Sequence, residues 1–309
     1  MIWYNLCYIT TKLIMGVNMK NKMNTVHKIT ILIIALGIII SATGLLYVSQ
    51  GQPYDFVNQY GDIIKMHGNG LYANDSHFMA PLFRGTDFTM LFVGIPLLIL
   101  ALVLDIKKNT LKTRLFLVSI ISMFTYYSTS IAFGVTYNIL HLLYIALFAS
   151  TFFGLILAIR SINEKQLAES IKETLPTKGI NRFLVFSGVA LIIAWLPDII
   201  TSLVSGKSLQ LIEVYTTAIT YILDMGIIAP VAIICLFELK KRTGMGYILL
   251  TMLLSICAII GVMLPMQSIF QVLAGIEIPI PALITKVASF VILAAFAINF
   301  NVRLFKNFK

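Results

Sequence analysis

Eight stretches of about 20 residues carry no more than one charged side chain each, and no other feature limits the fold of this chain as strongly. An α-helix of about 20 apolar residues crosses a hydrocarbon core of ~30 Å. Backbone groups inside a bilayer must hydrogen-bond to each other, and no stretch alternates with a period of two, so the sequence predicts helices and not barrel strands. The expected spans are 29–49, 88–106, 115–134, 139–159, 183–204, 214–237, 247–265 and 282–300.

The composition favours a single membrane domain. Of the 309 residues, 59% are hydrophobic and only 12% are charged, and the mean hydropathy is +0.92. Soluble domains carry about 25% charged residues. Once the apolar stretches are removed, only short connections remain. We therefore expect an all-α, polytopic membrane protein with a domain over 29–300, a segment 1–28 before it and a basic tail over 301–309.

Lysine and arginine are distributed unevenly between alternate connections. The N-terminal segment, the connections 107–114, 160–182 and 238–246 and the C-terminal tail hold 19 of them, whereas the other connections hold three. Basic residues collect in cytoplasmic loops, so both termini are expected in the cytoplasm of a cell-membrane protein. The net charge of +10 follows this pattern and forms no single patch, so we expect no nucleic-acid partner.

Two segments outside the spans carry further expectations. Met19 opens a short basic stretch before the first span, so translation from Met19 or Met23 is an alternative in which residues 1–18 are absent. In the long first external connection, apolar residues between 54 and 66 recur at helical spacing before His67 and Gly68. This pattern predicts an amphipathic helix over 54–66, lying on the outer membrane surface or over the mouth of the bundle.

The sixth span carries the most informative polar residues. Glu213, Thr217, Thr220 and Asp224 are separated by 4, 3 and 4 residues, which places them on one face of a helix. Pro230 removes the helical partner of a carbonyl one turn earlier. A carboxylate within the membrane beside a free carbonyl is typical of proton or cation sites in transporters. The alternative is that the stripe packs against another helix, with Asp224 paired.

Three more ionisable residues complete the candidate binding site. Asp198 follows a proline in the fifth span, Lys286 lies one turn inside the last span, and His141 lies at the outer end of the fourth. The depth of Lys286 suits an ion pair with Asp198 or Glu213. We expect these residues to contribute to a polar pocket that is open towards the outer leaflet.

Enzyme and cofactor motifs are missing from the sequence. It contains no HExxH, GxSxG or paired CxxC pattern, and its loop histidines and aspartates match no standard metal spacing. We therefore expect no cofactor, metal or catalytic residues, and a membrane-embedded enzyme ranks third among the functional hypotheses.

The leading hypothesis is a transporter of a small solute or ion with its acidic site at Asp224. The alternative is a non-catalytic sensor or a subunit of a larger membrane complex. The expected partners are the lipid bilayer, a small solute or cation, and membrane partner subunits. The chain divides into four spans plus four, but we find no residue-level similarity between the halves and predict no repeat.

Overall fold

The computed structural model describes residues 19–209, 211–278 and 280–309. This part of the chain contains eight helical segments that are long and apolar enough to cross a membrane, which supports the predicted multi-pass membrane protein. These segments are Met23–Leu46, Met79–Lys108, Leu111–Gly134, His141–Ile159, Thr177–Ser205, Ile219–Lys240, Gly244–Leu273 and Val287–Lys306.

The first half of the chain contributes four spans and a small hairpin. Its elements are α2 (Met19–Leu46), β1 (Tyr54–Val57), β2 (Ile63–Met66), α3 (Met79–Thr89), the π-helix η1 (Met90–Gly94), α4 (Ile95–Lys108), α5 (Leu111–Gly134) and α6 (His141–Ile159). The elements α3, η1 and α4 follow each other without a break and form one span.

The second half contributes the other four spans after a short connecting helix. Its elements are α7 (Glu164–Ser170), α8 (Thr177–Ser205), α9 (Ile219–Leu223), the π-helix η2 (Asp224–Ile228), α10 (Ala229–Lys240), α11 (Gly244–Leu273) and α12 (Ile280–Lys306). Here α9, η2 and α10 form one continuous span.

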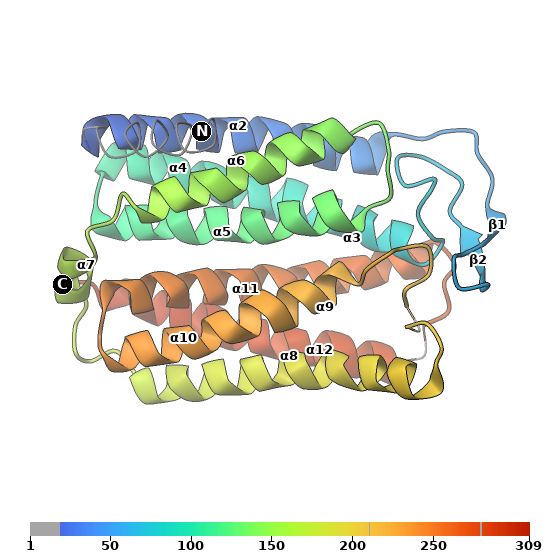
Figure 1. Ribbon diagram of the computed structural model, residues 1–309. Coiled ribbons are helices and arrows are strands. Elements are labelled where there is room, and N and C mark those ends of the chain that lie inside the picture. Colours follow the sequence, from blue (N-terminus) through green and yellow to red (C-terminus); the bar gives the residue numbers. More distant parts are fainter. Residues whose placement is uncertain (1–18, 210, 279) are drawn as a thin grey trace, which may run out of the picture.

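The spans run roughly parallel in two layers (Figure 1). One layer holds the first-half helices and the other holds the second-half helices, and α11 packs against α3 and α5 between them. We call the end with β1 and β2 the hairpin end, and the end with α7 and the C-terminus the tail end. The basic connections 107–114, 160–182 and 238–246 all lie at the tail end (Figure 1). Which side of a cell membrane this end faces remains a prediction from the charge count.

The two halves repeat one order of elements, so the prediction of no repeat is wrong. In each half the second span contains a five-residue π-helix, and a proline follows two residues after its end, at Pro96 and Pro230. Because proline lacks an N–H, the preceding turn widens, and the N–H groups of Ile95 and Ala229 donate five residues back.

The turn after this span also repeats. Residues 105–110 read D-I-K-K-N-T and residues 238–243 read E-L-K-K-R-T. The fifth position of each segment has a positive φ, 45° at Asn109 and 54° at Arg242. The threonine of each segment, Thr110 or Thr243, then caps the next helix with its side chain. Both copies begin at the tail end, so the repeat is parallel.

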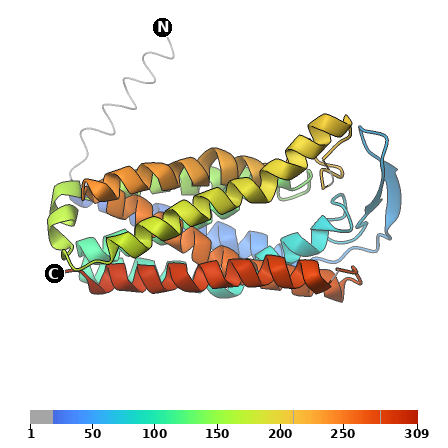
Figure 2. The ribbon, with the colours of Figure 1, turned by 90° about the horizontal axis from the view of Figure 1, so that it is seen from below.

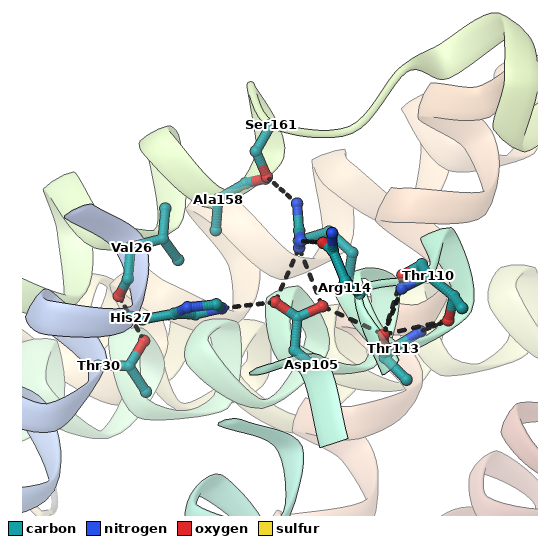
Figure 3. A network of polar contacts seen from close by, with 10 residues as sticks. Val26, His27, Thr30, Asp105, Thr110, Thr113, Arg114, Ala158 and Ser161 are labelled. Carbon is teal, nitrogen blue, oxygen red and sulfur yellow. Dashed lines mark hydrogen bonds and ion pairs between the residues drawn. The ribbon is translucent and has the colours of Figure 1, made fainter. Parts of the chain in front are cut away.

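A buried ion pair joins helices of the first half at the tail end (Figure 3). The Asp105 carboxylate accepts hydrogen bonds from Arg114 Nε at 2.9 and 3.0 Å, and His27 Nε2 lies 2.8 Å from Asp105 Oδ2. The arginine also reaches Asn109 Oδ1 at 2.9 Å and Ser161 Oγ at 3.5 Å. The network therefore links α2, α4 and α5 and the residues after α6.

The prediction of an amphipathic helix over 54–66 is wrong. These residues form an antiparallel hairpin in which Phe56 pairs with Ile64 and Val57 with Ile63. Its turn is closed by Asn58, whose side-chain oxygen accepts from the Tyr60 and Asp62 amides. Aromatic and β-branched residues fit strands as well as helices, so apolar spacing alone did not separate the two structures.

Candidate functional site

Asp224 is buried within the bundle and has two hydrogen-bond donors. Its side chain is 4% exposed although it is the sixth residue of the span Ile219–Lys240. Tyr126 Oη of α5 donates to Oδ1 at 3.1 Å, and Trp195 Nε1 of α8 donates to Oδ2 at 2.9 Å. The indole ring stacks on Tyr221 with 4.6 Å between ring centroids. The prediction that Asp224 faces the bundle is confirmed.

The local backbone explains why a carboxylate can be held here. Asp224 is the first residue of η2, and its carbonyl accepts from the Ala229 amide because Pro230 cannot continue the α-helical pattern. A π-turn widens the helix and changes the direction of its side chains, and such turns are frequent at functional sites.

The prediction of a polar stripe on one helical face leading to Asp224 is wrong. Helix α9 begins only at Ile219, so Glu213 and Thr217 lie before the helix, and Thr217 and Thr220 are exposed. The segment before α9 instead contacts the connection that carries β1 and β2. Asn58 Nδ2 donates to the Glu213 carbonyl at 2.8 Å. These long-range contacts hold residues 211–218 out of the helical conformation.

Among the described residues, Asp198 and His141 form no hydrogen bond with Asp224. Asp198 is half-buried and accepts from Tyr221 Oη at 2.7 Å. His141 is the first residue of α6, with its ring centroid 5.3 Å from that of Tyr137. The side chain of Lys286 is outside the described residues, so its ion pair with Asp198 or Glu213 stays a prediction.

A cavity of about 650 Å³ lies between α8, α10, α11 and α12. Its lining is almost entirely apolar, and among the described residues Asp224 is its one acidic group. The lining extends along α8 from Gly179 to Ala194, which corresponds to about 20 Å at 1.5 Å per residue. The Asp224 carboxylate thus lies at the end of the cavity that is farther from the tail end.

Asp87 is another buried carboxylate, and the predicted spans placed it in a loop. It is fully buried in α3, where Tyr72 Oη donates to Oδ2 at 2.5 Å and Tyr127 Oη donates to Oδ1 at 3.1 Å. The predicted span began at 88, but the helix begins nine residues earlier, at Met79. The apolar residues at 78–83 are the signal that could have extended the span.

Asp224 and Asp87 are connected through neighbouring tyrosines of α5. Tyr126 donates to Asp224 in the second half, and Tyr127 donates to Asp87 in the first half. Successive residues on a helix point about 100° apart, so α5 presents one phenol to each carboxylate. Among the described residues no ion pair neutralises either of them.

Asp75 is a further buried carboxylate, and it joins the halves at the hairpin end. Asp75 Oδ1 accepts from the Thr136 amide and from Tyr215 Oη, each at 3.0 Å. Burial raises the pKa of the Asp75 carboxyl to about 7. Burial also raises the pKa of Glu213, which accepts a hydrogen bond from Ser76. Nearby, no three His, Cys, Asp or Glu side chains of the described chain are close enough to hold a metal ion.

The pKa of Asp75 predicts that the hairpin end loses stability as pH rises. Between pH 3.8 and about pH 7, the Asp75 carboxyl is mostly protonated in the folded state and mostly ionised in the unfolded chain. Folding is therefore less favourable at pH 7.5 than at pH 5. The loss should reach about 2–3 kcal/mol. Asp75→Asn keeps the acceptor for Thr136 and Tyr215 but does not titrate.

Hydrogen exchange of peptides from the 67–78 segment measures this effect. His67, His77 and Glu213 are present in both proteins, so the difference in opening free energy between wild type and Asp75→Asn reports on Asp75. We expect the variant to become relatively more protected from pH 5 to 7.5. A difference that is constant with pH would contradict the prediction.

Comparisons with known proteins add no identity: no family model, no curated protein and no solved structure matches this chain.

Proposed function

We propose that the protein is a membrane carrier of a small solute and that Asp224 is its solute-binding and proton-binding group. The observation that carries the proposal is the position of this carboxylate, which is buried within a span and lines a cavity of about 650 Å³. Ligand pockets in proteins commonly measure about 300–1,000 Å³. The cavity therefore has the size of a small organic molecule.

The chemistry around Asp224 suits a group that changes its charge state. Tyr126 and Trp195 are neutral donors, and they offset only part of the cost of a buried negative charge. A proton or a positively charged solute would remove the remainder. Binding of either one excludes the other, which is the property that couples proton movement to solute movement in a carrier.

Asp224→Asn is expected to abolish coupled transport while leaving folding nearly intact. Asparagine keeps an acceptor oxygen for Trp195 or Tyr126 but cannot exchange a proton. Proteoliposomes that contain pyranine and carry an imposed pH gradient measure the coupling. Wild type should dissipate the gradient when a transported solute is added from a panel of amines, carboxylates and neutral metabolites.

Glu238→Gln is the matched control because this carboxylate belongs to the same span but does not line the cavity. We expect it to retain the flux per folded molecule. Equal flux through Asp224→Asn, or no protein-dependent flux with any probe, would contradict the carrier proposal. Either result would favour the alternative of a sensor or complex subunit.

A further inference from the structure

The internal repeat shows where the second half departs from the first. In the first half the outer helices α2 and α6 pack against each other. Gly154 of α6 permits this contact, because a Cβ atom there would lie 2.9 Å from Ile29 Cγ2 of α2. By position in the repeat, α8 corresponds to α2 and α12 corresponds to α6.

The equivalent pair in the second half touches near the tail end, where the ring centroids of Phe183 and Phe300 lie 5.5 Å apart, but packs less closely overall. Among the described residues no comparable packing joins α8 to α12, and the apolar cavity occupies the space between them. Figure 2 shows α8 diverging from α12 towards the hairpin end. Only 11% and 17% of the residues in the most apolar stretches of these two helices are buried. The cavity therefore lies at a lipid-facing edge of the bundle.

The lining of the cavity combines aromatic rings with one carboxylate. Five phenylalanines contribute to it, namely Phe183, Phe186, Phe290, Phe296 and Phe300. The face of an aromatic ring attracts cations, and the attraction grows when water is excluded. Arg182 also lines the cavity, but it is exposed and lies in the first turns of α8, at the tail end.

We propose that this cavity binds a lipophilic organic cation that arrives from the bilayer between α8 and α12, with its charge beside Asp224 and its apolar groups against the phenylalanines. The proposal rests on the proposed carrier function and names the class of its solute. A lipophilic cation dissolves in the bilayer, fits an apolar lining without leaving polar groups unpaired, and supplies the charge that neutralises the buried carboxylate.

Tetraphenylphosphonium and tetraphenylborate test the sign of the charge, because they share size and shape. Trp3 and Trp195 are the two tryptophans of the chain. Trp3→Phe leaves Trp195, whose indole donates to Asp224, as the only fluorophore of this type. We expect tetraphenylphosphonium to change its emission saturably and to bind in equilibrium dialysis, with tetraphenylborate at least tenfold weaker. Equal binding of the borate would overturn the proposal.

Two variants test the place of binding. Asp224→Asn should weaken tetraphenylphosphonium binding by roughly 30-fold or more, because it removes one partner of a buried charge pair. Ser187→Phe should weaken it at least tenfold by filling the cavity, whose lining includes Ser187. Val189→Phe is the control, since Val189 is 49% exposed on the same helix and does not line the cavity. Equal binding by wild type and both test variants would overturn the proposal.

Failure of this inference can be distinguished from failure of the carrier function. Binding of the phosphonium that depends on Asp224 but occurs without flux would keep the site and exclude the carrier. Flux of another solute that depends on Asp224, without phosphonium binding, would keep the carrier and exclude this solute class.

Discussion

Asp105→Leu is expected to lower the free energy of unfolding by about 3–5 kcal/mol, the range for removing one partner of a buried ion pair. The carboxylate is fully buried, and the Arg114 side chain is 8% exposed. Without Asp105 the guanidinium keeps, within the described part of the chain, only Asn109 and Ser161 as neutral acceptors. Its charge then remains in the protein interior without a counter-charge. Thermal or SDS-induced unfolding of the purified protein measures the change.

The repeat supplies a matched control for this prediction. Glu238 occupies the position of Asp105 in the second half, but it is 25% exposed and its ion pair with Lys241 spans 3.7 Å. Exposed pairs contribute about 0–1 kcal/mol, so Glu238→Leu should cost little. The double variant Asp105→Leu/Arg114→Leu should be more stable than the sum of its single changes implies. Equal losses of stability for Asp105→Leu and Glu238→Leu would refute the prediction that the buried ion pair of Asp105 contributes more than the exposed pair of Glu238.

The number and type of the spans could be predicted because they depend on local properties. A run of about 20 apolar residues requires a membrane, and a membrane requires closed backbone hydrogen bonds. The inward orientation of Asp224 followed from the same reasoning, since a carboxylate that faces lipid costs at least about 2.5 kcal/mol. Trp195 and Tyr126, which donate to it, could not be identified because they come from other helices.

The errors occurred where long-range contacts decide the local structure. Arg84, Thr86 and Asp87 made the start of the second span look like a loop, yet Thr86 and Asp87 are buried in the bundle. Glu213 and Thr217 have helical spacing to Asp224, but contacts with the hairpin connection hold their segment outside the helix. A hydropathy pattern contains no information about such partners.

The repeat was missed for a different reason. Its clearest sequence similarity is between the short segments 105–110 and 238–243, and a one-residue shift separates this match from that of the π-helices and prolines. In a membrane chain most other positions hold interchangeable apolar residues, so the similarity does not stand out. The common backbone geometry identifies it, through the positive φ of Asn109 and Arg242 and the threonine caps that follow them.

Gly85→Val is expected to cost about 3 kcal/mol or more, at the upper end of the usual effect of overpacking. Gly85 lies in α3, where the backbone of α11 approaches closely. A Cβ atom at this position would lie 2.5 Å from Gln267 Cα and 2.7 Å from Gln267 N. Backbone atoms cannot rotate away as a side chain can. Helices α3 and α11 would therefore have to separate.

Separation would affect the contact between the halves because α3 and α11 belong to different halves. Gln267 Nε2 donates to Thr86 Oγ1 at 2.8 Å across this contact, and the bond would lengthen or break. Gly226→Val is the matched control, since a Cβ atom at Gly226 has nothing within 4 Å. Folding yield and unfolding temperature in detergent should fall sharply for Gly85→Val and much less for Gly226→Val. Similar values for the two variants would show that the close approach of α3 and α11 does not limit stability.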